Sequence, residues 1–516
     1  MKLWELVLAI VGIICLLLGA IWIRRGELPK QEFTISDGGC NMPVTWIQPP
    51  AGVNPAGSAI FIHGLSANRR LMTYLGEDFA GHGFNSYLVD LPGHGDNTVP
   101  FNFLRAQQCA SAAVESLIRS GKIEAKTTVL VGHSMGGAIS IRVADRDPVA
   151  ATIAISPGPS NLPQRMPANL LVFSASGDIA YLKSQAKKLK AAAGGDRTEA
   201  EDFAEARAFQ LEHVPHSTHT SLIMDRRVAH EAELWAMRTL FPQVSSETLA
   251  LNLDLATYET YKLGRRRLAG AFLGECGIFL LFPICATIVA KIAGLSRAES
   301  EERHPGFLLA ILEFAFCSLV GVLILTLGVP LRFLHLYSAD YLVSLLLIVG
   351  GIVIILNRKI AREIFALKST QVFAAAALGF ATFLGLGAWL NWQITDAWLT
   401  APRWLRFAGV LPIVWIYMYA EEVMLGPVQS GKGRALRFGK FLILRLELWL
   451  ACAVGVYFLG SSQILLVILF TFLLLFSVLQ RLAADALRLR GAHSTAAALF
   501  SAILAAWFVA AVFPLT

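Results

Sequence analysis

A serine flanked by glycines is the clearest sign of chemistry in the chain. Ser134 lies in the run Gly132-His133-Ser134-Met135-Gly136-Gly137, directly after the apolar residues 128–131. A G-x-S-x-G string between a strand and a helix forces the serine onto a tight turn, where small flanking residues prevent collisions. Such a string also arises by chance in a glycine-rich chain, so the elements around it must decide. If the turn forms, Ser134 is an exposed nucleophile beside a helix N-terminus.

The elements around Ser134 alternate between buried strands and helices. Short apolar runs typical of strands are residues 58–62, 85–89, 128–131, 151–155, 169–173 and 209–214. Because turns and helical stretches separate these runs, the pattern predicts a mainly parallel sheet covered by helices. The first run leads into His63-Gly64-Leu65-Ser66. The N–H groups of Leu65 in that turn and of Met135 after the serine are the predicted donors of an oxyanion hole.

Three motifs together resemble a known family. His63-Gly64, Asp90-Leu91-Pro92-Gly93-His94-Gly95 and the run around Ser134 are similar to the monoacylglycerol-lipase and lysophospholipase branch of the α/β-hydrolase fold. The resemblance covers roughly residues 32–241 and is silent about the rest. It implies an α/β hydrolase fold and hydrolysis of carboxylic esters, with acylglycerols or lysophospholipids as substrates. Amide, thioester and peptide cleavage use the same machinery, so a serine aminopeptidase is the nearest enzymatic alternative.

A serine nucleophile of this kind needs a histidine as its base and an acidic residue that orients the histidine, an arrangement called the relay below. The acidic residue is predicted from its position in the chain. In this fold the chain order is serine, acid, histidine. Residues 169–173 lead to Ser174-Ala175-Ser176-Gly177-Asp178, which places Asp178 on the loop after a strand. The loop after the preceding strand offers no alternative, since no Asp or Glu occurs between residues 151 and 169. Asp178 is therefore the predicted acid, and a loop-capping aspartate is the structural alternative.

The histidine of the relay is chosen among the four that follow Asp178, which are His213, His216, His219 and His230. The first lies in a predicted strand and the last inside a helical stretch. His219 is favoured over His216 because it directly precedes the residues predicted to form the next helix. His219 would take the Ser134 proton while Asp178 fixes its tautomer. No metal-ligand spacing stands out among the histidines, so neither a metal nor another cofactor is expected.

The composition predicts a membrane protein. The chain is 55% hydrophobic with a mean hydropathy of +0.56. Residues 3–23 are long enough to span a bilayer and lack a cleavage-site pattern, which predicts a retained anchor. Eight further spans are predicted to begin near Leu268, Phe307, Tyr341, Gln371, Trp404, Phe441, Ile464 and Ala496. The predicted organisation is an anchor at 1–25, an α/β-hydrolase domain at 30–245, a linker at 246–267 and an all-α polytopic transmembrane domain at 268–516.

Loop charges predict the orientation of these spans. One side carries fourteen Lys and Arg residues and the side of the hydrolase carries seven. Since basic loops stay in the cytoplasm, the hydrolase and Thr516 are predicted to be extracytoplasmic in a plasma (inner) membrane protein. Lys2 agrees with this orientation, whereas Arg24 and Arg25 oppose it. The net charge of +7 is attributed to loops near anionic lipid, so the expected partners are the bilayer and a lipid-like ester, without nucleic acid.

Three smaller features complete the sequence predictions. Cys40 and Cys109 either pair, if the domain is outside the cytoplasm, or are two buried free thiols. Glu421 and Glu422 end one predicted span, and Arg445 and Glu447 begin the next at a similar depth, which predicts a structural ion pair among them. A transport path is the alternative, which would make the chain a transporter-like protein with an accessory hydrolase. Only about a dozen loop residues, 157–168, separate the predicted strand that ends at residue 155 from the one that begins at residue 169, so no large lid is expected over the site.

Overall fold

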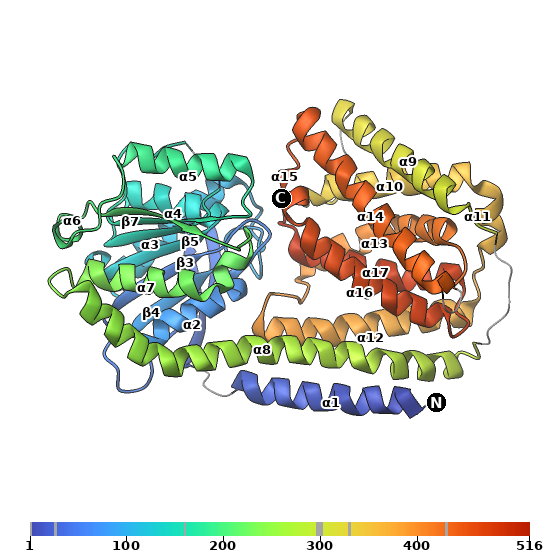
Figure 1. Cartoon of the computed structure of the whole chain (residues 1–516), viewed down its shortest axis with the longest axis horizontal. Helices are drawn as coiled ribbons and strands as arrows, with labels where there is room; N and C mark the ends of the chain where they lie inside the picture. The colour runs from blue at the N-terminus through green and yellow to red at the C-terminus, as the bar shows by residue number, and fades with distance from the viewer. Residues whose placement is uncertain (1–2, 25–27, 159–160, 296–302, 329–331, 429–431) are drawn as a thin grey trace. The chain divides into compact units, whose positions relative to one another are not determined.

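The computed structural model describes residues 3–24, 28–158, 161–295, 303–328, 332–428 and 432–516, without the side chains of 251–266, 393 and 432. The chain forms two compact units (Figure 1). The sheet unit comprises Leu18–Leu273, Leu390–Ala397 and Pro514–Thr516. The helical unit comprises Met1–Leu17, Gly274–Trp389 and Trp398–Phe513. Two short segments from the second half of the sequence therefore belong to the sheet unit.

The sheet has eight strands in the order β1-β2-β4-β3-β5-β6-β7-β8. β2 pairs antiparallel with both of its neighbours, β1 and β4. All other pairings, from β4 to β8, are parallel. The strands are β1 Lys30–Asp37, β2 Cys40–Ile47, β3 Gly57–Ile62, β4 Phe84–Val89, β5 Thr128–His133, β6 Ala151–Ile155, β7 Leu170–Ala175 and β8 Phe209–Val214. Parallel strands bring their carboxyl ends to one edge, where the loops that bear polar residues meet. This is the fold class that the sequence predicts.

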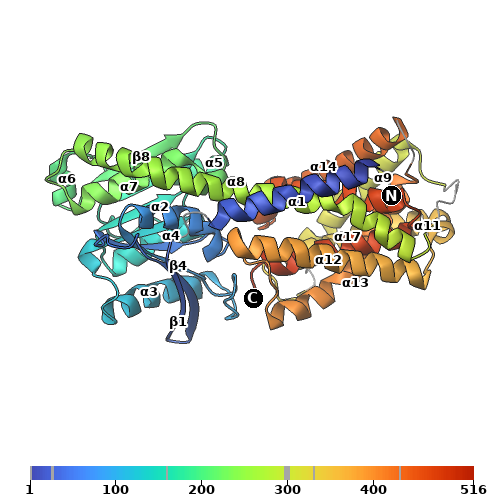
Figure 2. The same ribbon diagram turned by 90° about the horizontal axis from the view of Figure 1, so that it is seen from below.

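Helices cover both faces of the sheet. α2 (Thr73–Gly81) and α7 (Arg226–Leu240) pack on one face, where a core cluster contains Phe61, Phe79 and Trp235. α4 (Met135–Arg146) and α5 (Ala180–Ala192) pack on the other face. Figure 1 shows α5 and α7 on opposite sides of the sheet, and Figure 2 shows α3 (Phe103–Arg119) on the side away from α7. Because both faces are covered, strands β3, β5, β6 and β7 are buried along their whole length.

A disulfide joins Cys40 in β2 to Cys109 in α3. The sequence left this pairing open against two free thiols. The other five cysteines, which lie in apolar helices, are free. The crosslink closes a loop across 69 residues, so it restricts the unfolded chain and stabilises the sheet unit.

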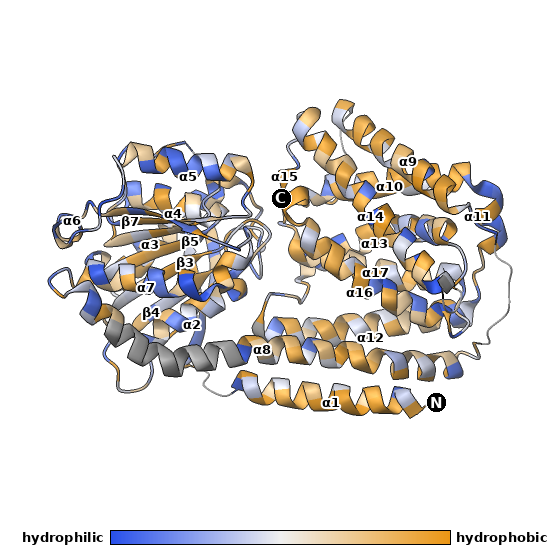
Figure 3. Cartoon of the chain, in the orientation of Figure 1, coloured by the Kyte–Doolittle hydropathy of each residue, from blue (hydrophilic) through white to orange (hydrophobic). Residues whose placement is uncertain are grey.

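Nine helices among the described residues are long and apolar enough to cross a membrane, as many as the sequence predicts (Figure 3). The candidate spans are Leu3–Arg24 in α1, Arg267–Ile292 in α8, Phe307–Leu327 (α9), Ala339–Leu356 (α10), Ser369–Trp392 in α12, Ala401–Leu425 (α13), Gly433–Phe458 in α14, Phe470–Arg488 (α16) and Ser494–Val512 (α17).

Two boundaries differ from the sequence prediction. The predicted linker 246–267 is helical and continuous with the next span in α8 (Ser246–Ile292), because no proline interrupts it before Pro283. The span predicted from Ile464 begins at Phe470, and a short helix α15 (Ile464–Ile468) precedes it.

A buried ion network links α13, α14 and α16 in the helical unit. Arg445 lies 2.8 Å from Glu421, and Glu422 lies 2.6 Å from Arg481 and 2.9 Å from Arg437. The predicted structural ion pair is thus confirmed between Glu421 and Arg445, and no ion pair of Glu447 is found among the described residues. Paired charges of this kind are tolerated inside a membrane protein, so the network is explained by structure alone.

The network also corrects the count of loop cations. The fourteen predicted loop cations of the cytoplasmic side include Arg437, Lys440 and Arg481, but all three are buried within helices. On the other side Arg403 is buried as well, and its guanidinium donates to the carbonyls of Ala510 and Phe513. Loop cations that lie outside the described residues or side chains are Lys2, Arg25, Lys262, Arg265, Arg266, Arg297 and Lys432.

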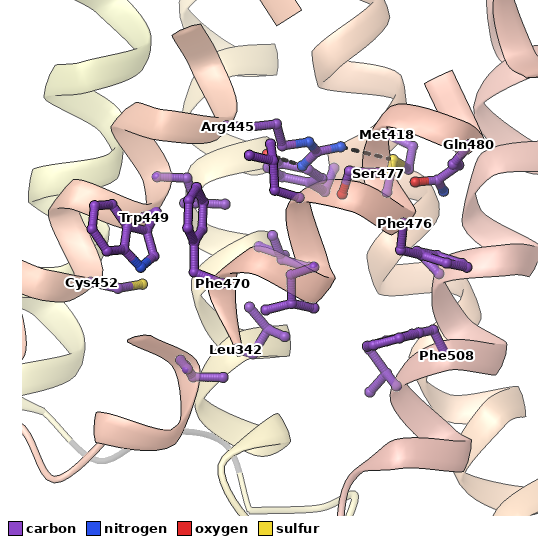
Figure 4. Close-up of a pocket in the computed structure, with 18 residues that line it drawn as sticks. Leu342, Met418, Arg445, Trp449, Cys452, Phe470, Phe476, Ser477, Gln480 and Phe508 are labelled. Atoms are coloured by element: carbon purple, nitrogen blue, oxygen red, sulfur yellow. Dashed lines mark hydrogen bonds between the residues drawn. The ribbon is translucent and has the colours of Figure 1, made fainter. Parts of the chain in front are cut away.

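A cavity of about 110 Å³ lies beside this network (Figure 4). Arg445, Met418, Ser477 and Gln480 gather at one end of it, and apolar side chains such as Phe508 line the rest. No histidine or carboxylate is among the residues that line it, so it lacks the acid–base groups that ester hydrolysis requires.

Candidate active site

The turn that carries Ser134 joins β5 to α4. Ser134 has φ 53° and ψ −117°, a conformation that an L-residue adopts only under constraint. The two glycines of the motif explain how the turn fits. A Cβ on Gly132 would lie 2.2 Å from the carbonyl oxygen of Gly136, and a Cβ on Gly136 would lie 2.0 Å from that of Ile62. The motif is therefore a strained nucleophile elbow, as its spacing predicts.

Three polar side chains meet at the carboxyl edge of the sheet. His219 Nε2 lies 2.9 Å from Ser134 Oγ, and His219 Nδ1 lies 2.9 Å from Asp178 Oδ1. Ser134 follows β5, Asp178 follows β7 and His219 follows β8. In this relay Nδ1–H donates to the carboxylate, which leaves Nε2 free to accept the hydroxyl proton of Ser134. The geometry is that of a general base poised on a nucleophile.

The carboxylate of Asp178 is held by several donors. The backbone N–H of Ala175 donates to Oδ2 at 2.8 Å, and the hydroxyl of Ser156 lies 2.8 Å from both oxygens. Burial raises the pKa of Asp178, but the hydrogen bonds from His219 and Ser156 outweigh it and hold the pKa below its usual value. Asp178 is thus ionised at neutral pH.

Ser156 is a member of the site that the sequence analysis missed. It directly follows β6, has φ 43° and is 2% exposed. Its hydroxyl also lies 2.9 Å from His219 Nδ1, so it contacts both the acid and the base. Its position is the signal that the sequence offers: β6 pairs in parallel with β7, so a serine directly after β6 is adjacent to the loop of Asp178.

His133 fixes the backbone of the base. Its Nε2–H donates to the carbonyl oxygen of His219 at 2.9 Å. Burial lowers the pKa of His133 to about 3, so its ring is neutral at neutral pH. His133 thus holds the main-chain carbonyl of His219 in place.

The His63 turn, residues 63–68, lies against the nucleophile. A Cβ on Gly64 would lie 3.2 Å from Ser134 Cβ and 3.0 Å from His133 Nδ1, so only glycine allows this approach. His63 holds the turn, because its Nδ1–H donates to the Gly64 carbonyl at 2.8 Å and its Nε2 accepts from the N–H of Leu91 at 3.0 Å. Burial lowers the pKa of His63 to about 4, which keeps this tautomer neutral.

The two predicted oxyanion donors flank the serine in the structure. Leu65 follows Gly64 in the His63 turn, and Met135 is the first residue of α4. The N–H of a residue in the first helical turn has no acceptor within its own helix, so the Met135 amide is available to a ligand. The structure thus brings both segments to Ser134, while their role in binding an oxyanion is part of the proposal below.

The structure separates His216 from the site. His216 is exposed on the loop after β8, with φ 54°, whereas the ring of His219 contacts Ser134 and Asp178. The alternative base that the sequence left open therefore has no contact with the relay among the described residues.

The entrance to the site carries no inserted domain. Between β6 and β7, the described residues 156–158 and 161–169 form no helix or strand. This agrees with the short loop in the sequence.

Two groups of acidic and histidine side chains lie away from the relay. In the first, His82 lies 3.0 Å from Glu233, close to Asp78. Burial lowers the pKa of His82, but the two carboxylates outweigh it and raise the pKa to about 9, so His82 itself is the cation there. In the second, Asp90, Asp96 and Asp396 surround Arg69. Both clusters are neutralised by cations of the chain itself.

Comparison with known proteins matches the sheet unit to a family of known fold. Residues 59–243 match the alpha/beta hydrolase family. Similar solved structures include a serine hydrolase without a lid from Xanthomonas campestris (16% identity, TM-score 0.33, 42% of this chain and 95% of the other). The esterase of Pyrobaculum calidifontis is also similar (14%, 0.33, 48% and 94%), as is the ferulic acid complex of Est1E from Butyrivibrio proteoclasticus (14%, 0.29, 41% and 98%). No curated protein matches the chain.

The sheet unit is therefore an alpha/beta hydrolase domain. This fold supports ester hydrolysis in general, and the nine long apolar helices among the described residues are compatible with a multi-pass membrane protein.

Proposed function

We propose that the chain is a membrane-embedded serine hydrolase that cleaves carboxylic esters of lipid-like substrates through an acyl-enzyme. The observation that carries the proposal is the relay of two 2.9 Å hydrogen bonds from Ser134 through His219 to Asp178. Each member comes from a different loop, at a separation of 41 residues or more, so the fold alone brings them together. A binding module has no need for a strained serine beside an oriented base.

The proposed reaction has two half-reactions. Ser134 Oγ attacks the ester carbonyl while its proton moves to His219 Nε2, and Asp178 stabilises the imidazolium. The negative charge on the carbonyl oxygen is received by the N–H groups of Leu65 and Met135. The tetrahedral intermediate collapses, and the alcohol leaves with the proton from His219. Water activated by His219 then attacks the acyl-enzyme and releases the carboxylic acid.

The proposed substrates are acylglycerols or lysophospholipids. The nine long apolar helices in the described part of the chain support a substrate that is delivered from a bilayer. The site also lies beside a short loop rather than beneath an inserted lid, so a separate lid is not needed for an ester to enter. A serine aminopeptidase uses the same relay on an amide and is distinguished by the assay below.

We also propose that the sheet unit lies outside the cytoplasm of a plasma (inner) membrane. The disulfide between Cys40 and Cys109 supports an oxidising compartment. The segments Leu390–Ala397 and Pro514–Thr516 belong to the sheet unit and must lie on its side of the membrane. Four spans separate the sheet unit from the first segment and eight separate it from the second, so both return to the same side.

The test uses the full-length protein in lipid nanodiscs. Hydrolysis rates are measured for a monoacylglycerol, a lysophosphatidylcholine and an aminoacyl arylamide. Ser134→Ala should lower ester hydrolysis by about 10³-fold or more without changing expression. The control is Ser120→Ala, which removes a hydroxyl that only bonds a carbonyl at the end of α3. Ester hydrolysis that persists in Ser134→Ala would contradict the proposal, and turnover of the arylamide alone would favour the aminopeptidase.

A further inference from the structure

We propose that Thr395 and Asp396, which follow the membrane-spanning helix α12, are positioning residues that hold the His63 turn and its oxyanion donor in place. The inference rests on the proposed function, because it assigns these residues to the same site. It means that a loop between two spans completes the hydrolase domain. The alternative is that the loop adds stability to the domain without influencing the reaction.

The first contact joins Thr395 to the end of the His63 turn. Asn68 Nδ2 donates to Thr395 Oγ1 at 2.7 Å, across 327 positions of the sequence. The other side-chain atom of Asn68, Oδ1, accepts from the N–H of Arg70 at 3.1 Å and caps the short helix η1 (Arg69–Met72). Asn68 is 5% exposed, so a lost partner would leave a buried donor unsatisfied. Thr395 therefore fixes the orientation of the residue that ends the turn.

The second contact joins Asp396 to the two arginines after the turn. Oδ1 of Asp396 pairs with Arg70 Nε, and Oδ2 lies 3.9 Å from Arg69 Nη1. The side chain of Asp396 is 2% exposed, and that of Arg69 is 3% exposed. Oδ2 has no hydrogen-bond donor within 3.5 Å among the described residues. The longer contact with the guanidinium of Arg69 is therefore what mainly offsets the cost of burying this oxygen. Asp396 thus bridges two consecutive cations at the start of η1.

The contacts continue from Arg69 back to the His63 ring. The N–H of Arg69 donates to Asp90 Oδ1 at 2.7 Å, and its guanidinium pairs with the same carboxylate. Asp90 precedes Leu91, whose N–H donates to His63 Nε2 at 3.0 Å. The His63 turn is therefore held at both ends, by His63 at its start and by Asn68 and Arg69 at its finish.

The C-terminal segment supports the same loop from another direction. Leu515 accepts from the N–H of Phe101 at 2.7 Å and donates to the carbonyl of Gly93 at 2.9 Å. The ring of Phe101 packs against His94, which packs against His63 with ring centroids 4.9 Å apart. Both segments from the second half of the sequence therefore reach the surroundings of His63, although they are separated from each other by 116 residues.

The position of the His63 turn matters for catalysis, because an oxyanion donor stabilises the negative oxygen only over a narrow range of distances. The N–H must lie about 2.7–3.1 Å from the developing negative oxygen. A displacement of about 1 Å in a positioned group can lower a rate by about 100-fold. Leu65 lies between the two held ends of the turn, and Gly64 already packs against Ser134. A loosened Asn68 or Arg69 therefore changes the turnover number rather than substrate affinity.

The charged groups around Asp396 influence its protonation and so indicate which substitution is the conservative one. Burial, with the nearby carboxylates Asp90 and Asp96, raises the pKa of Asp396 to about 7 against the opposing effect of Arg69 and Arg70. Glu32 also faces these arginines, at 3.7 Å from Arg69 and 3.8 Å from Arg70. The neutral form of Asp396 is therefore populated near pH 7. Asp396→Asn resembles that form and keeps an oxygen for Arg70 Nε, whereas Asp396→Ala loses it.

The experiment measures kcat and KM of the full-length protein in nanodiscs with a short soluble ester. We expect Thr395→Val and Asp396→Ala each to lower kcat by about tenfold with KM changed by less than about twofold. Asp396→Asn should restore kcat to within about threefold of the unchanged protein. Fluorophosphonate labelling of Ser134 should slow in parallel, because that reaction also places negative charge at the oxyanion donors.

The control is Asp202→Ala, which removes another buried carboxylate of the sheet unit, at 3.0 Å from Arg207 and away from the relay. It should lower thermal stability and leave kcat unchanged. Unchanged kcat in Asp396→Ala and Thr395→Val would overturn the inference, as would an equal loss in Asp202→Ala or the absence of rescue by Asn. If Asp396→Ala does not fold, the value of kcat in the near-isosteric variant Thr395→Val decides whether the inference holds. Without Ser134-dependent hydrolysis in the unchanged protein the proposed function fails as well, whereas its presence leaves only the positioning role in question.

Discussion

Replacement of Ser156 by alanine tests how much of the reactivity depends on the group that joins the acid to the base. The hydroxyl is 2% exposed and lies 2.8 Å from both oxygens of Asp178 and 2.9 Å from His219 Nδ1. In Ser156→Ala the carboxylate keeps the N–H of Ala175 and the ring of His219. It loses one charge-assisted donor, and a hydrogen bond to a charged group contributes about 1.5–3 kcal/mol.

That free energy sets the expected size of the effect. If most of it is expressed in the transition state, where His219 is charged, kcat/KM falls by about 10- to 100-fold. The loss is mainly in kcat, because Ser156 is behind the relay and does not face the ester. The effect should be smaller than the roughly 10⁴-fold loss that follows when a triad aspartate becomes asparagine, since Asp178 itself remains.

The assay compares Ser156→Ala with Ser111→Ala in the full-length protein. Ser111 is a matched control, because its buried hydroxyl also donates to an aspartate, Asp147, but outside the relay. We expect Ser111→Ala to keep kcat/KM while its thermal midpoint falls. Full activity in Ser156→Ala, or the same loss in both variants, would refute the reasoning that Ser156 acts through His219 and Asp178.

Three further predictions follow from the same structure. His219→Ala should lower ester hydrolysis about as much as Ser134→Ala, whereas exposed His216→Ala should change it little; the reverse order in initial rates would assign the base to His216. Replacing the paired Cys40 and Cys109 by serine should lower the stability of the sheet unit by about 2–5 kcal/mol, seen as a lower temperature at which labelling of the active serine is lost. The pKa of His63 is about 4 when folded and 6.5 ordinarily, so only the unfolded chain gains its proton between these values. Stability should therefore fall as the pH drops from about 6.5 to 4, by on the order of 3 kcal/mol, and a constant thermal midpoint over that range would contradict this.

Much of the hydrolase domain follows from local patterns in the sequence. Short apolar runs predict the strands because both faces of a parallel sheet are covered, and the observed β6 and β8 have the predicted bounds. Chain order places Asp178 and His219 after Ser134 because the loops at the carboxyl ends of β5, β7 and β8 meet at one edge. The requirement for glycines around Ser134 is also local, because the collisions that they avoid are those of a tight turn between a strand and the next helix.

Contacts between distant segments could not be predicted in this way. Ser156 carries no motif, and its role depends on β6 lying between β5 and β7 in the sheet. The partners of Glu422, which are Arg437 and Arg481, depend on how α13, α14 and α16 pack, and hydropathy does not specify that packing. Asp396 lies 326 positions from Arg70 in a short loop between two spans, where nothing in the local pattern points to the hydrolase domain.

One measurement tests the central claim most directly, namely the identification by mass spectrometry of the residue that a fluorophosphonate modifies in the full-length protein. The strained φ of 53° and the 2.9 Å contact with His219 predict that Ser134 carries the adduct. Excess monoacylglycerol should slow the modification, because the ester occupies the same site. An adduct on another serine, or equal labelling with and without the ester, would contradict the account.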